Sequence, residues 1–444
     1  MVLRLFAIGL CLLCPGWAAA DDWLDLIPAA ALEDQQPAAE TTTSATGFRK
    51  NSLRLSAVGY DWRTPFPAYS HDTPNWGTSA QSNMLGRHDV GKLSARWNLR
   101  LQSGTSDDNT FDAQKDSHLF IKEAYLSSTT DRLFVDGGRI NQRYGVASGF
   151  NPTDFYRGHS ALPANNADPG SRREDRLGTL ALRLTRLWSG TSATLIFSPD
   201  LHAGEESLAG GKDLVGLLLN RTNNSNRATL SLEKQLPFGL TGEALLHLEE
   251  EDPTLGMNLS LLLGDSWLIQ VETSLGYRLS LRNERCATAQ DKDWLVQSAA
   301  GISWTSSADL SLTFEFHYNQ AGLSASDWNH WFDQARVANR NPALRGSLWF
   351  VRQLARERQE PLSRVEFFAR FSWNDALVND LNLSALAQSN PYDTSLMLQL
   401  QGIYSISDAL QLTTRLISNS GAKNSEYGSL ANSLTTVCQL EYFF

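Results

Sequence analysis

Arginine is concentrated in one internal stretch of the chain. Between positions 139 and 176 there are six arginines and no lysine, interspersed with acidic residues. The arginines are Arg139, Arg143, Arg157, Arg172, Arg173 and Arg176, and the acids are Asp154, Asp168, Glu174 and Asp175. A guanidinium stays charged, and its planar fork can hold a carboxylate or phosphate through two hydrogen bonds. This stretch is therefore suited to binding or guiding anions.

A second set of residues could in principle support acid–base catalysis. Glu315 and His317 are two positions apart, and His247 also lies in a segment predicted to be a strand. Two polar residues at this spacing are expected on the polar face of any half-buried strand. The sequence contains no CxxCH, Walker-type or HExxH motif. We therefore predict neither an enzyme nor a bound cofactor or metal ion.

The elements that carry these residues have a period of two. The clearest segment is Lys92 to Gln102, where every odd position is apolar and every even position is polar, including Arg96 and Arg100. The same alternation surrounds Glu315 in Leu310–Asn319 and Arg370 in Arg364–Trp373. Segments of about ten residues with this alternation are typical of strands in a transmembrane β-barrel. Charged residues in mid-strand suit a water-filled lumen and do not suit a two-sheet core.

The last eleven residues, LTTVCQLEYFF, alternate in the same way and end on an aromatic residue. Leu434, Cys438, Leu440, Tyr442 and Phe444 would share one face of a strand. This pattern resembles the closing strand of bacterial outer-membrane β-barrels, which the barrel-assembly machinery reads. The resemblance implies an outer-membrane barrel that depends on that machinery for insertion.

A further resemblance lies in residues 123–157, EAYLSSTTDRLFVDGGRINQRYGVASGFNPTDFYR. A strand leads into Gly137-Gly138-Arg139 and then into the turn at Phe150–Asp154. This element is similar to one in large Gram-negative barrels of the porin-like and alginate-export-like families. The resemblance covers residues 123–157 and the final strand, and it indicates the class of protein but not its solute.

The connections between the segments come in two sizes, short and long, as expected for periplasmic turns and external loops. The segments number 18 or 19 on a strict count, and we predict an all-β antiparallel barrel of about 16 to 18 strands. The three weakest assignments are Leu344–Leu354, Pro199–Arg227 and the Gly104–Ser117 connection. Long loops are predicted at Arg63–Val90 and Gln320–Pro342, the latter with a helix at Asp327–Ala338 capped by Ser324 or Ser326.

The amino-terminal residues indicate export. An apolar run after Arg4 is followed by Ala18-Ala19-Ala20, a cleavage site of the secretory type. We predict a signal peptide at 1–20, a periplasmic segment or linker at 21–48, and the barrel at 49–444. Mean hydropathy is −0.30, and no later run reaches the ~18 apolar residues of a membrane helix. The net charge of −10 argues against a nucleic-acid partner.

These observations predict an outer-membrane channel that passes small hydrophilic solutes, with anions preferred. The residues predicted to line the pore are Arg96, Arg100, Arg139, Arg143, Asp154, Arg157, Glu315 and Arg370. The arginine-rich loop could fold into the lumen as a constriction, because rings of arginine favour anions in a pore. It could equally lie outside, where its arginines would pair with its acids or with lipopolysaccharide phosphates.

Two other functions remain open. The barrel could be an export conduit for a polymer or secreted product, with a periplasmic partner bound through residues 21–46. It could also be a non-conducting structural or adhesive barrel. The expected surroundings are outer-membrane lipid and lipopolysaccharide, and the oligomeric state is not predicted.

Overall fold

The structure is a computed structural model, which describes residues 47–68, 75–104, 117–162, 164–201, 217–282 and 291–444. The predicted signal peptide lies outside the described residues, and so does the linker except for its last two positions. Those two positions, 47 and 48, already belong to the first strand.

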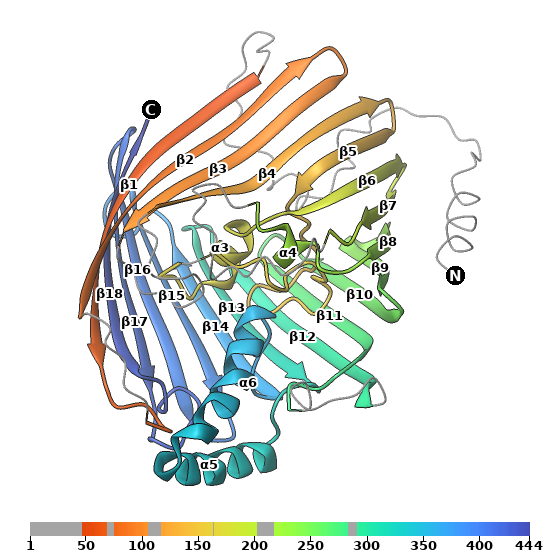
Figure 1. The fold of residues 1–444 in the computed structure, drawn as a ribbon. Coiled ribbons are helices and arrows are strands. Elements are labelled where there is room, and N and C mark those ends of the chain that lie inside the picture. The colour runs from red at the N-terminus through yellow and green to blue at the C-terminus, as the bar shows by residue number, and fades with distance from the viewer. Residues whose placement is uncertain (1–46, 69–74, 105–116, 163, 202–216, 283–290) are drawn as a thin grey trace.

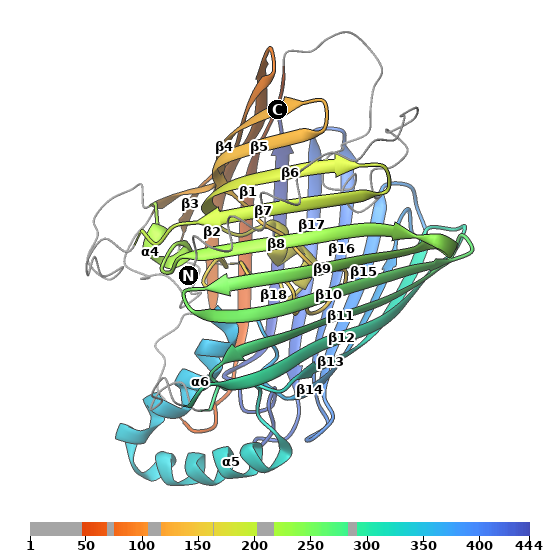
Figure 2. The ribbon, with the colours of Figure 1, turned by 90° about the vertical axis from the view of Figure 1, so that its right-hand side faces the viewer.

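Eighteen antiparallel strands form one closed sheet in the described residues, and each strand pairs with its neighbours in the sequence. Closure comes from the first and last strands, whose register runs from Ser52 opposite Phe443 to Trp62 opposite Asn432. The strands are β1 (Gly47–Trp62), β2 (Trp76–Val90), β3 (Leu93–Gly104), β4 (Ser117–Thr130), β5 (Leu133–Ile140), β6 (Thr179–Trp188), β7 (Thr191–Ser198), β8 (Arg227–Leu236), β9 (Leu240–Glu249), β10 (Asp252–Leu263), β11 (Trp267–Arg278), β12 (Asp293–Thr305), β13 (Leu310–Asn319), β14 (Val365–Trp373), β15 (Leu381–Asn390), β16 (Ser395–Ser407), β17 (Leu410–Ser420) and β18 (Asn432–Phe443). Figures 1 and 2 show the ring of strands from two sides. The predicted barrel is confirmed, at the upper end of the expected strand number.

The two faces of the strands differ as the alternation predicts. In β13, Phe314 and Phe316 are 57% and 42% exposed, whereas Glu315 and His317 between and beside them are buried. In β18, Leu440 and Tyr442 are exposed on the outside. The exterior is therefore apolar and the interior polar, which is the reverse of a water-soluble protein and is expected for a barrel in lipid.

The two ends of the barrel differ in their connections. Both termini of the described chain and most of the short turns lie at one end, and the helices α5 and α6 lie at the other (Figure 1). The short turns 249–252 and 390–395 lie at the end with the helices. Short turns include 188–191, 236–240 and 305–310, close to where the sequence predicts them. The long connections at the other end include the arginine-rich stretch between β5 and β6.

One predicted loop, Arg63–Val90, is wrong because it contains β2. The outward face of β2 mixes large apolar residues with small or polar ones: Trp76, Met84 and Val90 share it with Ala80, Ser82 and Gly86. A Cβ on Gly86 would lie 2.3 Å from the Trp97 ring of β3. Trp97 therefore covers the outward position of Gly86, which has no apolar side chain of its own.

Two weak strand assignments also do not hold. Leu344–Leu354 lies mostly in the helix α6 (Arg345–Glu357), and Pro199–Arg227 contains the short helix α4 (Leu219–Thr222) among its described residues. In α6 the residues that pack against α5 are Leu348, Val351, Leu354 and Ala355. This spacing of three and four is that of a helix. The third assignment, Gly104–Ser117, falls largely outside the described residues.

The remaining helices include α3 (Pro169–Glu174), α5 (Ala325–Arg340) and the 3-10 turns η2 (Pro237–Gly239) and η4 (Pro342–Leu344). Helix α5 confirms the predicted helix, and Ser324 caps it in a capping box with Asp327. Trp328, Trp331 and Phe332 of α5 form an apolar cluster with α6. No described helix is long and apolar enough to cross a membrane.

Candidate functional site

Residues 141–178, without position 163, form a segment that we call the strap. It connects β5 to β6 but runs across the interior of the barrel (Figures 1 and 2). Asn165 accepts hydrogen bonds from Tyr60 of β1 at 3.3 Å and from Arg415 of β17 at 2.7 Å. Thr153 donates to Asn258 of β10 at 2.9 Å. The strap therefore contacts distant parts of the wall, and the structure places the arginine-rich loop inside the barrel.

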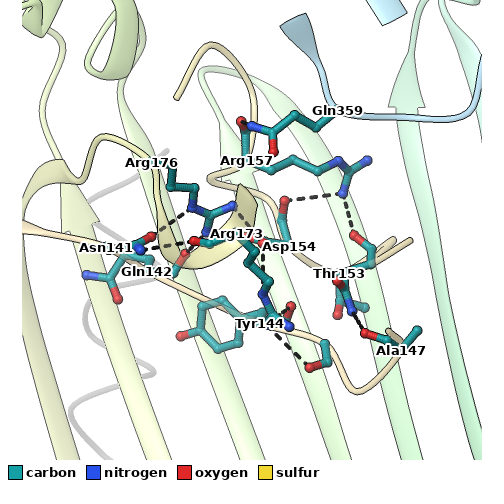
Figure 3. Close-up of polar contacts among 12 residues, drawn as sticks. Asn141, Gln142, Tyr144, Ala147, Thr153, Asp154, Arg157, Arg173, Arg176 and Gln359 are labelled. Carbon is teal, nitrogen blue, oxygen red and sulfur yellow. Dashed lines mark hydrogen bonds and ion pairs between the residues drawn. The ribbon is translucent and has the colours of Figure 1, made fainter. Parts of the chain in front are cut away.

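Within the strap the charges largely satisfy each other. Arg176 donates to both oxygens of Asp154, at 2.8 and 3.0 Å, and to Asn141 at 2.7 Å (Figure 3). Arg173 lies 3.4 Å from the same carboxylate. Arg176 and Asp154 are each 1% exposed. The sequence left two interpretations open, a loop inside the lumen and an external loop whose arginines pair with its own acids. The structure has the loop inside the barrel and the arginines paired with acids.

Two carboxylates of the wall hold the middle of the strap through its backbone. Glu272 of β11 accepts hydrogen bonds from the amides of Val146, Ala147 and Thr153, at 2.8–3.2 Å. Glu315 of β13 accepts from the amides of Ser148 and Gly149 at 2.6 and 2.8 Å. These backbone amides have no sheet partner, so the carboxylates supply the acceptors that a buried chain requires.

Glycines allow this close approach. A Cβ on Gly145, whose φ is +101°, would lie 2.5 Å from the Glu272 carboxylate. A Cβ on Gly149 would lie 2.6 Å from the ring of His317 and 2.7 Å from that of Phe368. Both positions therefore need glycine for the strap to reach the wall.

The far end of the strap is held by cations of the wall. Arg100 and Lys122 each lie 2.6 Å from the carboxylate of Asp175. Burial alone would raise the pKa of Asp175, but these two cations hold it well below its usual value. Lys122 lies at a β-bulge, because Asn98 pairs with Glu123 and Leu99 with Ile121. The bulge lets two successive residues, Lys122 and Glu123, face the lumen, which simple alternation does not predict.

The other predicted pore residues have varied surroundings. Arg96 lies against Tyr125 with its guanidinium 6.0 Å from the ring centre, and Arg370 lies 3.6 Å from Asp168. Arg139 is buried and donates to the backbone oxygens of Gly178 and Leu217. Arg143 is half-buried in the strap. A pore-lining role for these residues stays a prediction.

The strap meets α6 and the residues that follow it. The amide of His159 donates to the Glu357 carbonyl at 2.8 Å. Gln359 donates to the Arg157 carbonyl at 2.6 Å, and Arg157 donates to the Arg358 carbonyl at 3.1 Å. Glu360 lies beside Arg157, at 3.8 Å. Two connections from the same end of the barrel therefore join over the lumen.

A small cavity of about 30 Å³ lies where the strap and α6 meet the connection between β7 and β8. Three arginines line it, Arg172 of α3, Arg221 of α4 and Arg356 of α6, and Glu357 is the one acidic residue among the described residues of its lining. Burial lowers the pKa of Arg221, while Glu357 opposes that shift. The cavity also has apolar lining at Ala161, Leu162 and Ala164.

Comparison with solved structures identifies the architecture. OccK8 (OprE) of Pseudomonas aeruginosa matches with a TM-score of 0.54 at 8% identity, covering 90% of this chain and 98% of the other. OccAB4 of Acinetobacter baumannii matches with a TM-score of 0.52 at 9% identity, covering 90% and 98%. Both are similar along nearly their whole length. The chain has the fold of an outer-membrane porin.

A third structure with this fold contains a small molecule. OpdK of Pseudomonas aeruginosa, described with vanillate, matches with a TM-score of 0.50 at 7% identity, covering 90% of this chain and 98% of the other. No family model matches the chain. No curated protein matches it either. The likeness is thus one of fold.

The sequence did not point to several residues that line the cavity or hold the strap inside this porin fold. Arg221 and Arg356 lie far apart in the sequence, and only the folding of three connections brings them to Arg172. Glu272 could be placed on the polar face of its strand, but nothing in the sequence relates it to backbone amides more than 100 residues away.

Proposed function

We propose that this protein is an outer-membrane channel for small hydrophilic solutes, with a preference for anions. The observation that carries the preference is the cavity lined by Arg172, Arg221 and Arg356, where Glu357 is the one acidic residue among the described lining residues. Arginines in the lumen of a pore favour anions, and a guanidinium can hold a carboxylate or phosphate in a defined orientation.

Other features support the same proposal. The exterior of the barrel is apolar and the interior polar, which suits a location in the bacterial outer membrane. The long connections at the end with α5 and α6 would then face the outside, with lipopolysaccharide around them. A structure with the same fold holds vanillate, which is an organic carboxylate.

The test is conductance of the refolded protein in a planar bilayer. We expect ion channels whose reversal potential in a salt gradient indicates anion preference. The double variant Arg172→Gln/Arg356→Gln removes two of the three guanidiniums and should shift the reversal potential toward cations. Arg336→Gln is the matched control, because Arg336 is exposed on α5 and pairs with Asp333.

Unchanged selectivity in the double variant, with a normal barrel on gels, would reject the proposed role of the cavity. A barrel that inserts but does not conduct would favour the non-conducting structural or adhesive alternative. Conductance that appears only with a periplasmic partner would favour an export conduit.

A further inference from the structure

His317 of β13 is a fully buried titratable group of the wall that faces the strap. Its Nε2 lies 2.9 Å from Glu315 and its Nδ1 lies 3.0 Å from Glu366 of β14. The side chains of His317 and Glu315 are 0% exposed. The rings of Phe150 and Phe368 cover the imidazole, with centroids at 5.8 and 5.9 Å.

This geometry determines where protons must be. A neutral imidazole has one N–H and one bare nitrogen, so it can donate to only one carboxylate. The second nitrogen would then face the lone pairs of the other carboxylate at hydrogen-bond distance. An imidazolium instead donates to both carboxylates and offsets one of their two charges. The arrangement is therefore satisfied when the site holds this additional proton.

The imidazole lies between the strap and the outer connections. On one side Glu315 accepts the amides of Ser148 and Gly149 in the strap. On the other side Glu366 accepts from the Tyr427 hydroxyl at 3.3 Å, and Tyr427 belongs to the connection between β17 and β18. His317 is thus the bridge between a carboxylate that holds the strap and one that contacts an outer connection.

We propose that His317 is a positioning residue that, as an imidazolium, fixes the strap across the lumen through Glu315. The effect of His317 on conductance rests on the proposed channel function, because the strap sets how much of the lumen is open. His317 does not contact a solute in this arrangement. It acts by keeping Glu315 in place beneath the strap amides.

The charge balance at this site is well defined. The titratable groups that face His317 are Glu315 from its own strand and Glu366 from β14. Tyr427, Glu426, Asp393 and Arg352 lie one step further out, around Glu366 and Glu426. Without its proton, the site would hold Glu315 and Glu366 as two carboxylates with no cation between them. Loss of the proton as the pH rises should therefore loosen the strap.

The experiment compares three variants of the full-length refolded protein. His317→Gln removes the cation and leaves both carboxylates. His317→Gln/Glu366→Gln removes one charge of each sign and so restores the balance. His330→Gln is the control, because His330 is exposed on α5. Each is measured by hydrogen exchange of the strap amides 146–153 and by single-channel conductance from acidic to alkaline pH.

In the wild type we expect the strap amides to be protected from exchange and the conductance to be steady at acidic and neutral pH. Both should be lost toward alkaline pH. His317→Gln should lose protection at every pH and give a larger, noisier current, and the double variant should regain protection without the alkaline transition. Strap protection in His317→Gln equal to that in the wild type would overturn the inference. If His317→Gln does not assemble, the double variant alone decides: an alkaline transition that persists in it would also overturn the inference.

The two proposals can fail separately. Absence of current in the wild type would reject the channel, whereas hydrogen exchange of the strap would still test His317. Conversely, a conducting wild type with unchanged strap exchange in the variants would reject only the role of His317.

Discussion

At the scale of single residues, the interior is organised by the needs of a buried backbone. The strap has no sheet partners for many of its amides, and Glu272 and Glu315 accept them instead. The strap arginines in turn donate to carbonyl oxygens and to Asp154. An arginine-rich sequence therefore does not by itself mean free positive charge in the lumen, because part of that charge holds the strap together.

Glu272→Gln should release the middle of the strap. A glutamine keeps one oxygen, so its NH2 group would face either the Thr153 amide or the amides of Val146 and Ala147, which now donate to different oxygens of Glu272. Leaving one such buried donor unsatisfied costs about 1–3 kcal/mol, so exchange of amides 146–153 should rise roughly 5- to 150-fold. Hydrogen exchange measured by mass spectrometry would report this change.

Glu233→Gln is the matched control for that change. Glu233 is a wall carboxylate of β8 that accepts from Ser192 on the neighbouring strand. Its neutralisation should leave exchange of the strap unchanged. Equal effects of the two substitutions would contradict the proposed anchoring by Glu272.

The connection between β17 and β18 should respond to pH through Glu426. Burial raises the pKa of Glu426 from 4.5 to about 7. The packed connection therefore binds a proton more tightly than an opened one, so the stabilising effect is complete below pH 4.5 and is lost as the pH rises through 7. Exchange of residues 421–431, corrected for the intrinsic rate, should increase across this range by up to about tenfold per pH unit.

Glu426→Gln should remove this pH dependence and keep the connection packed at alkaline pH. The glutamine is neutral at every pH and can still accept from Ser363 and Asn390, which now donate to Glu426 Oε2. A connection whose exchange in the wild type is the same at pH 5 and pH 8 would argue against a proton on Glu426.

At the scale of elements, the outer helices depend on local signals that the sequence carries openly. The Ser324 hydroxyl accepts from the Asp327 amide, and the Asp327 carboxylate accepts from the Ser324 amide. Ser324→Ala should therefore destabilise the first turn of α5 by about 1 kcal/mol. Hydrogen exchange of residues 325–330 should increase several-fold.

Ser326→Ala tests the alternative cap that the sequence leaves open. Ser326 is exposed, and its hydroxyl contacts that of Ser324 at 2.9 Å. Its loss should have a much smaller effect on exchange of α5 than the loss of Ser324. The reverse order would assign the cap to Ser326.

The elements also indicate how far sequence reasoning can reach. Strands such as β13 were predictable because one face must be apolar and the other polar, which gives a period of two. Strand β2 was not predictable from its own residues, because its alternation is interrupted at Gly86. The Trp97 side chain of β3 covers that position instead. The course of the strap was not predictable either, since its anchors Glu272 and Glu315 are set by long-range contacts. Nor could alternation reveal that the adjacent residues Lys122 and Glu123 both face the lumen at a bulge.

At the scale of the whole molecule, the wall of the barrel has lipid on one side and a polar lumen on the other. Adjacent residues of one strand should therefore tolerate a charge differently. Val271 is 37% exposed on the outer face of β11, whereas Gln270 follows the inward parity of Glu272. Val271→Arg should destabilise the barrel in lipid by about 2–4 kcal/mol if the residue lies near the bilayer midplane. Gln270→Arg places the same charge one residue away in the polar lumen, where it should cost much less. Urea titration of both variants in lipid vesicles would measure this difference, and equal destabilisation would contradict a lipid-facing exterior at β11.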